Sequence, residues 1–188
     1  VNCLQIRLKK ENNECEDDEI IVRLFNKIKP VCDRYGTLII INDNPNVAKA
    51  VKADGVHLGQ KDADYSYARN LLGQKAIIGV TCHGSKELAF KAASLGANYV
   101  AFGAFYKSET KNAKYKANTE ILEWWQEAVE IPCVAIGGIN IDNADIVSNA
   151  GADSICVASA VTLAENPEIA TSKLVDILKS KANQRNLL

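Results

Sequence analysis

The phrase that decides the fold is Ala53-Asp54-Gly55-Val56, because it recurs in altered form twice further along the chain. Its later versions are Gly96-Ala97-Asn98-Tyr99-Val100 and Gly151-Ala152-Asp153-Ser154-Ile155. Each version leads into a short apolar run, and Gly96 and Gly151 suit the left-handed residue that ends a helix before the next strand. A repeated strand–helix unit predicts a parallel sheet with helices packed outside it.

Seven apolar runs are predicted to be strands. They are near-continuous rather than alternating, as is typical of strands buried on both faces. The runs are Leu4–Leu8, Thr37–Ile41, Gly55–Leu58, Ala76–Val80, Tyr99–Phe102, Cys133–Ile136 and Ser154–Val157. Amphipathic patterns between them predict helices. In the first of these, Ile20, Ile21, Leu24, Phe25, Ile28 and Val31 form one face, and we expect Pro30 to bend or shorten that helix.

Two architectures fit this alternation, an open doubly wound sheet and a (βα)8 TIM barrel. An open sheet that holds a dinucleotide needs a glycine-rich turn after its first strand, and Lys9-Lys10-Glu11 is no such turn. A barrel needs eight strands, and the chain starts at Val1, next to a strand, without any methionine. We therefore expect residues 1–188 to form a single α/β domain, a (βα)8 barrel that lacks its first βα unit in this chain.

Composition excludes several classes of protein. The chain is 47% hydrophobic and 24% charged, with 22 basic and 23 acidic residues and a net charge of −1, so no basic excess favours nucleic acid or acidic membranes. No apolar run approaches the roughly 18 residues of a membrane span, and no signal peptide is apparent. The six cysteines are Cys3, Cys15, Cys32, Cys82, Cys133 and Cys156. None forms a C-x-x-C pair, and Cys3, Cys133 and Cys156 lie in apolar runs, where cysteine behaves as a small hydrophobic residue, so we expect reduced thiols and a cytoplasmic protein.

Polar residues and glycines gather after the predicted strands, at the end of a parallel sheet that carries the site. In chain order they are Gln5, Arg7, Lys9, Asn42, Asp43, Gly59, Gln60, Asp62, Thr81, His83, Ser108, Thr110, Lys111, Gly137, Gly138, Ala158 and Ser159. Gln5, Arg7 and Lys9 alternate, so we expect them on one face of the first strand. Asp43 and Asp62 come from neighbouring strands and suit Mg²⁺, which prefers one or two carboxylates plus phosphate oxygens.

Glycines and small residues after the last two strands predict a phosphate site made of backbone N–H groups. Gly137-Gly138 and Ala158-Ser159 are the residues concerned. The polar insertion from Gly103 to Lys116 adds a compact donor cluster, Ser108-Glu109-Thr110-Lys111, of the kind that grips phosphate. Two anion sites and a metal indicate two phosphorylated substrates, one of them a diphosphate.

Structural readings of the same residues stay open at this point. Asn42-Asp43-Asn44-Pro45 can be a turn and helix cap, Asp62 can cap the following helix, and Gly137-Gly138 can serve a turn alone. The lysine-rich insertion can be a solvated loop. We expect His57 to be a core histidine and Trp124 and Trp125 to pack in a helix face, while His83 is ambiguous.

The chain resembles the thiamine phosphate synthase family along nearly its whole length. The matching phrases are Gln5-Ile6-Arg7-Leu8-Lys9, Ile41-Asn42-Asp43, Ala53 to Asp62, Ile78 to His83, Tyr99 to Phe105, Ser108 to Lys111, Val134 to Ile139 and Val157 to Ala160. The family fold is a (βα)8 barrel. The family joins a hydroxymethylpyrimidine diphosphate to a hydroxyethylthiazole phosphate in a dissociative reaction that releases pyrophosphate.

The resemblance also implies roles for individual residues. Those implied to hold the pyrimidine diphosphate are Gln5, Arg7, Lys9, Asn42, Thr81 and Lys111, and of these Arg7, Lys9 and Lys111 would neutralise the leaving pyrophosphate. Asp43 and Asp62 would bind Mg²⁺. Those implied to bind the thiazole phosphate are Ser108, Thr110, Gly138, Ala158 and Ser159. Ser108 and Thr81 depart from the family's usual threonine and serine but keep a hydroxyl.

Three rival functions remain at this stage. A thiazole tautomerase of the same family would need no diphosphate and would use His83 as acid or base. A non-catalytic barrel would bind thiamine phosphate without turnover. An aldolase-like or epimerase barrel would need a base or a Schiff-base lysine at a strand end. Lys9 could be taken for that lysine, but its neighbour Arg7 and the pair Asp43 and Asp62 fit a diphosphate better. Partners are expected to be phosphorylated small molecules, with no nucleic acid and no membrane, and a homodimer stays open.

Overall fold

The computed structural model describes residues 1–9, 16–107 and 115–185, and for residues 181–185 only the backbone. The chain divides into two compact units, Val1–Val80 and Thr81–Leu188. Within the described residues, no helix has the length and apolarity needed to cross a lipid bilayer.

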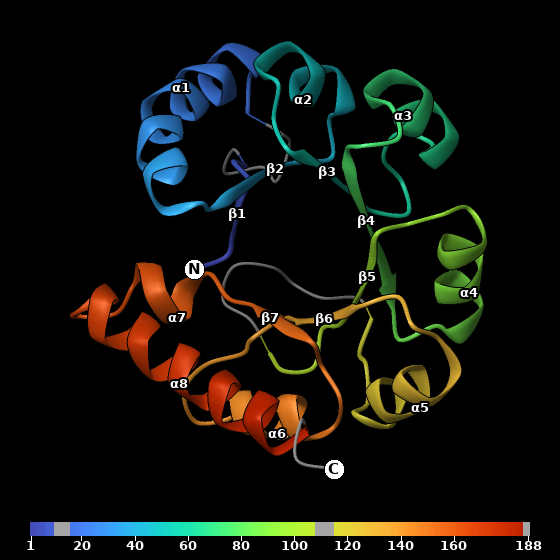
Figure 1. Ribbon diagram of the computed structural model, residues 1–188, viewed down its shortest axis with the longest axis vertical. Helices are drawn as coiled ribbons and strands as arrows, with labels where there is room; N and C mark the ends of the chain where they lie inside the picture. The colour runs from blue at the N-terminus through green and yellow to red at the C-terminus, as the bar shows by residue number, and fades with distance from the viewer. Residues whose placement is uncertain (10–15, 108–114, 186–188) are drawn as a thin grey trace. The chain divides into compact units, whose positions relative to one another are not determined.

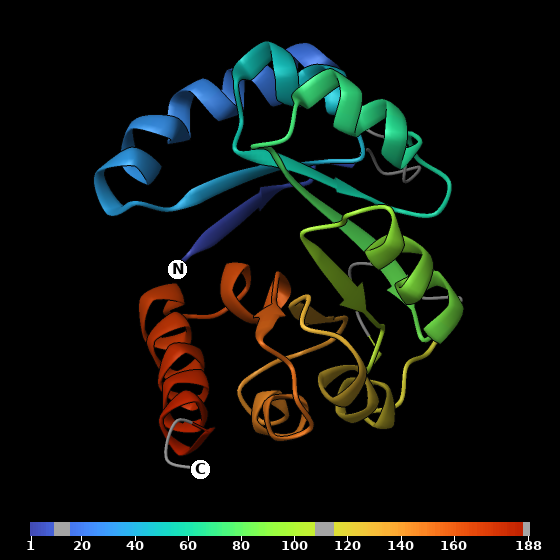
Figure 2. The same ribbon diagram turned by 45° about the vertical axis from the view of Figure 1, so that its right-hand side comes forward.

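The first unit alternates parallel strands and helices. Its elements are β1 (Cys3–Ile6), α1 (Asp18–Tyr35), β2 (Leu38–Asn42), α2 (Pro45–Val51), β3 (Gly55–Leu58), α3 (Tyr65–Leu72) and the first part of β4 (Ile77–His83). The strands pair in chain order, β1 with β2, β2 with β3 and β3 with β4. Helices α1, α2 and α3 cover one face of these strands (Figures 1 and 2). This is the arrangement that the repeated phrase predicts.

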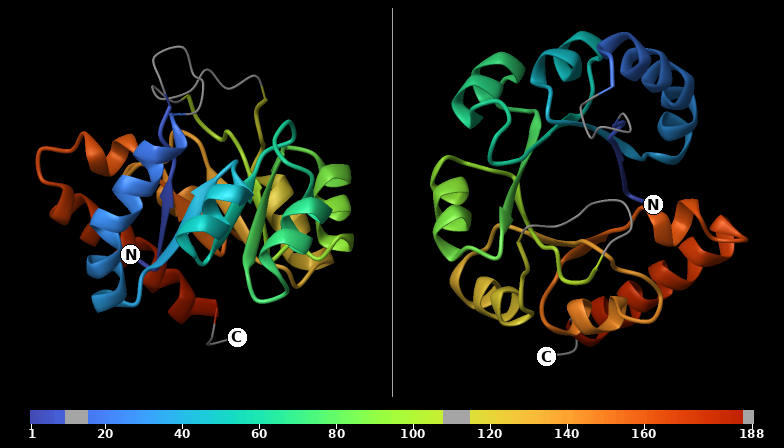
Figure 3. Two further views of the ribbon diagram at one scale, coloured as in Figure 1. Left: turned by 90° about the horizontal axis from the view of Figure 1, so that it is seen from above. Right: turned by 180° about the vertical axis from the view of Figure 1, so that it is seen from behind.

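The second unit continues the same pattern. It contains the end of β4, α4 (Lys86–Ser94), β5 (Tyr99–Phe102), α5 (Glu120–Ala128), β6 (Cys133–Ile136), α6 (Ala144–Asn149), β7 (Ser154–Cys156), α7 (Ser159–Thr162) and α8 (Pro167–Arg185). Strand β5 pairs with β6 and β6 with β7, again all parallel. Figure 3 shows α4, α5 and α6 on the outer side of these strands. All seven predicted strands are present, three of them with the predicted bounds.

The acidic residue of the repeated phrase has a structural role that explains its recurrence. The Asp54 carboxylate accepts a hydrogen bond from the Ile39 backbone N–H at 2.7 Å, and Asp153 accepts one from the Cys133 N–H at 2.8 Å. Each carboxylate precedes one strand and holds the start of the strand before it. The phrase therefore joins neighbouring strands at their amino ends, opposite to the ends expected to carry the site.

Strand β1 differs from its prediction. It covers Cys3–Ile6 rather than Leu4–Leu8, and Ile6 pairs with Ile41, so Arg7 and Lys9 follow the strand. The physical reason is that the chain leaves β2 after Ile6, and the Leu8 carbonyl accepts the Glu16 N–H at 3.3 Å. The common face of Gln5, Arg7 and Lys9 stays a prediction.

Helix α1 also corrects an expectation. It runs through Pro30 to Tyr35 and ends at Gly36, whose φ of 65° is the left-handed conformation that glycine adopts without strain. Pro30 therefore does not shorten the helix. The buried stripe is Ile21, Phe25 and Cys32. Of the residues assigned to the apolar face, Ile20 and Val31 are exposed, because they flank this stripe.

Candidate active site at the carboxyl ends of the strands

Asp43 follows β2 and is not the residue that caps helix α2, although the sequence allowed that role. The cap of α2 is Asn44, whose Oδ1 accepts the N–H groups of Asn46 at 3.0 Å and Val47 at 3.2 Å, with Pro45 in the first turn. Asp43 itself has a left-handed φ of 65°, and its N–H donates to the His57 carbonyl at 2.8 Å. The neighbouring residue thus caps the helix, and the Asp43 carboxylate turns to other partners.

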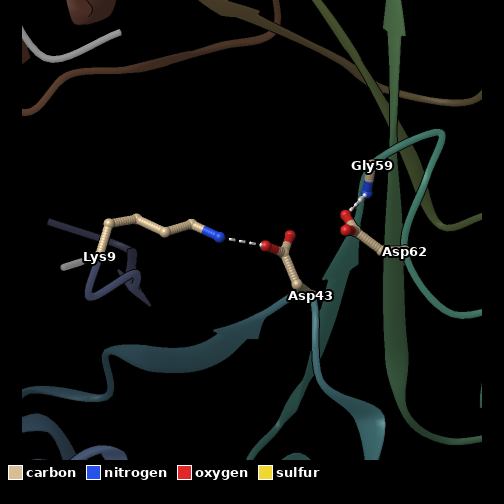
Figure 4. Close-up of polar contacts among 4 residues, drawn as sticks. All are labelled: Lys9, Asp43, Gly59 and Asp62. Carbon is tan, nitrogen blue, oxygen red and sulfur yellow. Dashed lines mark hydrogen bonds and ion pairs between the residues drawn. The ribbon is translucent and has the colours of Figure 1, made fainter. Parts of the chain in front are cut away.

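Asp43 forms an ion pair with Lys9. The Lys9 Nζ donates to Asp43 Oδ2 at 2.8 Å, and the two side chains are only 19% and 17% exposed (Figure 4). An ion pair so shielded from water is stronger than one on an open surface. The structure therefore brings together a cation that follows β1 and a carboxylate that follows β2.

Asp62 is the second carboxylate, and it likewise caps no helix. Asp64 caps α3 by accepting the N–H groups of Ser66 at 2.8 Å and Tyr67 at 3.2 Å. The Asp62 Oδ2 instead accepts the Gly59 N–H at 2.7 Å, which holds its carboxyl group on the same side as that of Asp43 (Figure 4). The loop after β3 thus aims a carboxyl group at the end of β2.

The two carboxyl groups affect each other's ionisation. Partial desolvation, a hydrogen bond with Asp43 and the negative charge of Asp43 raise the pKa of Asp62 to about 6, although the Gly59 N–H and Lys9 oppose the rise. Desolvation also acts to raise the pKa of Asp43, but the hydrogen bonds with Asp62 and Lys9 and the charges of Lys9 and Arg7 lower it overall. The pair thus tends to share one proton.

This donor set fits a hard divalent cation. Among the described residues, no group of three or more histidine, cysteine or acidic side chains could hold a metal by itself. Mg²⁺ is commonly held by one or two carboxylates while phosphate oxygens and water supply its remaining ligands, and Asp43 and Asp62 can supply the two carboxylates. A cation held there would take the place of the shared proton.

The other predicted residues of the first unit differ in burial. Gln5 lies within β1 and Asn42 ends β2, and both are half-buried. Arg7 is exposed after β1, where its positive charge helps to lower the pKa of Asp43. His57 lies in β3 and is buried, as expected of a core histidine, with 7% of the residue's surface exposed.

The glycine pair after β6 forms a tight loop in the second unit. Gly137 and Gly138 have φ values of 93° and 67°, and a Cβ on Gly138 would lie 2.4 Å from the Lys107 carbonyl oxygen. The Phe105 N–H donates to the Ile136 carbonyl at 3.2 Å, and the Tyr106 N–H to the Gly137 carbonyl at 3.0 Å. Only glycine fits this approach, so the pair fixes the first arm of the insertion against the end of β6.

The remaining predicted residues lie in the second unit or outside the described residues. Thr81 is half-buried in β4, and Ser159 begins the short helix α7 directly after Ala158. The His83 ring stacks on Tyr115 with centroids 4.2 Å apart. Trp125 is buried in α5, where its Nε1–H donates to the Ile131 carbonyl at 2.7 Å, so packing explains it. Ser108, Thr110 and Lys111 lie outside the described residues.

Sequence reasoning did not single out Asn143 or Tyr115. Asn143 precedes α6 and reads from the sequence as an ordinary helix cap, yet its side chain bonds to the glycine loop. Its spacing of five residues from Gly138 is the only signal that the sequence offers. Tyr115 gives no local signal, since it lies near the end of the insertion and contacts His83, which is distant in the sequence.

Comparison with known proteins agrees with this geometry. Residues 1–161 match the family described as thiamine monophosphate synthase. A thiamine-phosphate synthase of Rhodospirillum centenum is 47% identical over 161 residues, which cover 86% of this chain and 75% of that protein. One from Erythrobacter litoralis is 47% identical over 147 residues, or 77% of this chain and 69% of that protein.

A solved structure extends the likeness to three dimensions. The thiamine phosphate pyrophosphorylase from Pyrococcus furiosus superposes with a TM-score of 0.85 at 33% identity, covering 96% of this chain and 84% of that one. A 3-hexulose-6-phosphate synthase superposes with a TM-score of 0.66 at 17% identity, which is a likeness of fold alone. The expected α/β fold of the TIM-barrel class is confirmed, with seven parallel strands among the described residues.

Proposed function

Because the chain belongs to the thiamine monophosphate synthase family, we propose that it joins a hydroxymethylpyrimidine diphosphate to a hydroxyethylthiazole phosphate. The products are thiamine phosphate and pyrophosphate, so the activity is that of a transferase acting on phosphorylated small molecules. The observation that carries the proposal is the pair Asp43 and Asp62 beside Lys9, at the carboxyl ends of the strands of the first unit. A diphosphate with its cation is the ligand whose charge this group matches.

The diphosphate faces charges of the first unit. Lys9 is held in place by Asp43 in the absence of ligands, and its ammonium group carries three N–H donors that can reach a phosphate oxygen. Arg7, exposed after β1, offers a planar fork that suits a phosphate. Gln5 and Asn42 supply neutral amides that orient the pyrimidine diphosphate without adding charge.

Asp43 and Asp62 would hold Mg²⁺. When bound, it neutralises part of the negative charge of the diphosphate and of the pyrophosphate that departs. Lys9 competes with a cation for Asp43, so we propose that this lysine moves its hydrogen bond toward the substrate when the cation is present. The Gly59 N–H keeps the Asp62 carboxyl group oriented in either state.

The thiazole phosphate is proposed to bind the second unit. Backbone N–H groups of the loop at Gly138, together with Ala158 and Ser159, suit a phosphate monoester, since N–H groups near small residues leave room for its oxygens. Thr81 and Lys111 keep their predicted roles toward the diphosphate. Ser108 and Thr110 keep theirs toward the thiazole phosphate.

The bond changes require little proton transfer. In the proposed dissociative reaction, the C–O bond to the diphosphate breaks first, and pyrophosphate takes both electrons of that bond. The pyrimidine methyl cation that remains is captured by the lone pair of the thiazole nitrogen. The residues of the chain therefore act by stabilising the leaving group, by positioning the nitrogen and by excluding water, which would otherwise trap the cation.

The direct test is pyrophosphate release from both substrates, with and without Mg²⁺. We expect release that depends on Mg²⁺ and falls at least about a hundredfold in Asp43→Asn and Asp62→Asn. The matched control is Asp64→Asn, which removes a carboxylate two residues away and keeps a side-chain oxygen for the helix cap. Equal loss in the control would mean that general charge, and not this pair, matters.

The same experiment addresses the isomerase alternative. A thiazole tautomerase would release no pyrophosphate and would depend on His83 rather than on the two aspartates. A chain that binds thiamine phosphate but releases no pyrophosphate under any condition would be the non-catalytic alternative. Either result would overturn the proposed function.

A further inference from the structure

Asn143 occupies the N-cap position of α6 but makes no side-chain cap to that helix. Its side chain bonds to the loop that precedes it instead. The Oδ1 atom accepts the Asn140 N–H at 2.9 Å, and the Nδ2 atom donates to the Gly138 carbonyl at 3.1 Å. An asparagine that leaves the helix N–H groups uncapped in order to hold a glycine carbonyl is placed to control that peptide group.

The direction of the Gly138 carbonyl determines what the next N–H can reach. In a planar trans peptide the C=O and N–H groups point in opposite directions. Because the Gly138 carbonyl is turned toward Asn143, the N–H of Ile139 is turned away from it. Within the part of the chain that the structure describes, neither the Gly138 N–H nor the Ile139 N–H donates a hydrogen bond. Consecutive free N–H groups of this kind suit an anion.

We propose that Asn143 is the positioning residue of the loop that binds the thiazole phosphate. Gly138 has no Cβ and a φ of 67°, so its backbone can rotate more freely than that of any other residue. The hydrogen bond from Asn143 keeps the Gly138–Ile139 peptide from turning its carbonyl oxygen toward the phosphate, where it would repel the phosphate oxygens. This inference rests on the proposed function of the Gly138 loop and names the side chain that maintains it.

The test compares Asn143→Ala and Asn143→Asp with the control Asn140→Ala. Ala removes both hydrogen bonds, whereas Asp keeps an acceptor for the Asn140 N–H and loses the donor to Gly138. Asn140 is exposed, and among the described residues its side chain bonds only to the Asp142 N–H, so its removal leaves the Gly138 carbonyl held. We expect KM for the thiazole phosphate to rise about tenfold in both Asn143 variants, with KM for the pyrimidine diphosphate unchanged.

Two further readouts separate positioning from general damage. The preference for thiazole phosphate over the unphosphorylated thiazole alcohol should fall by the same factor, because only the phosphorylated substrate uses the loop. In the wild-type chain, inorganic phosphate should shift the amide resonances of Gly138 and Ile139, a measurement that does not depend on any variant folding. In Asn143→Ala these shifts should need about tenfold more phosphate.

The outcomes distinguish this inference from the proposed function. The role of Asn143 would be overturned if KM for the thiazole phosphate is unchanged in both variants. It would also be overturned if inorganic phosphate does not shift the Gly138 and Ile139 amide resonances of the wild-type chain. Both conclusions hold even if pyrophosphate is released. If the wild-type chain releases no pyrophosphate but phosphate shifts the two amides in an Asn143-dependent way, the proposed function fails and the positioning role stands.

Discussion

The ammonium group of Lys9 lies 2.8 Å from Oδ2 of Asp43, so the residues that follow β1 and β2 are joined by a shielded ion pair. We predict that Lys9→Met lowers kcat for pyrophosphate release about a hundredfold, because the leaving group loses a facing cation. The pKa of Asp43 should rise at the same time, since Lys9 lowers it. Steady-state kinetics and a carboxyl ¹³C NMR titration measure the two effects.

The control for this prediction is Lys29→Met. Lys29 pairs with Asp33 on the exposed surface of α1, so its loss should leave the kinetics unchanged. Both variants should keep most of their stability in urea unfolding, because neither pair is fully buried. A Lys9→Met chain with wild-type kcat would contradict the role given to this lysine.

Magnesium binding should depend on pH because Asp62 binds a proton with a pKa of about 6. A cation at the two carboxylates must displace that proton, so its affinity should rise between about pH 5 and about pH 7 and level off above. Calorimetric titration with Mg²⁺ alone measures this dependence. Affinity that is constant across this range would show that Asp62 is not a ligand.

Stability of the metal-free chain should change with pH in the opposite direction. The pKa of Asp62 is higher in the folded chain than its ordinary value of 3.8, so the folded state holds the proton more tightly than the unfolded state. Stability should therefore fall as pH rises from about 4 to about 6, by no more than about 1 kcal/mol because solvent screens this exposed residue. Asp62→Asn should remove this slope in urea unfolding.

Asp54 is predicted to stabilise the first unit through the Ile39 N–H. Asp54→Ala leaves that buried strand without its side-chain acceptor, and we expect a loss of about 1–2 kcal/mol of unfolding free energy. Asp54→Asn keeps an oxygen at the same position and should lose less. Urea unfolding of the two variants side by side measures the difference, and equal losses would mean that charge rather than the hydrogen bond is responsible.

Gly55 and Gly36 form a matched pair for testing close packing. A Cβ at Gly55 would lie 1.9 Å from the Ile77 carbonyl oxygen, so Gly55→Ala must separate β3 from β4 and should cost at least about 3 kcal/mol. Gly36 has a φ of 65° and open space around it, so Gly36→Ala should cost only the backbone strain of about 1–2 kcal/mol. The difference between their urea midpoints measures the steric part. Similar midpoints would contradict the close approach of β3 and β4.

The order and type of the elements could be predicted from the sequence because they depend on local signals. Buried parallel strands read as continuous apolar runs, and the phrase around Ala53, Ala97 and Ala152 marks the start of three of them. Strand ends could be predicted less well. The end of β1 at Ile6 depends on where β2 stops and on the bond between Leu8 and Glu16, which lie eight residues apart.

The sequence also predicted which residues gather at the candidate site, but it did not predict the role of each one. The sequence left Asp43 and Asp62 as ligands or helix caps. Only the structure separates the two roles, since Asn44 and Asp64 accept the helix N–H groups and leave Asp43 and Asp62 to face each other. In both cases the choice is between two neighbouring residues with the same capping chemistry, and backbone direction decides it.

By itself, then, the sequence determined the succession of strands and helices, the family and the set of polar residues at the strand ends, because periodicity and motif spacing are properties of the chain alone. Only the tertiary structure decided that Lys9 pairs with Asp43, that the pKa of Asp62 is raised, and that Asn143 holds Gly138. The first two of these depend on residues 34 and 19 positions apart along the chain. The third depends on the direction in which the Asn143 side chain turns. No local sequence pattern encodes a contact between distant residues or the direction of a side chain.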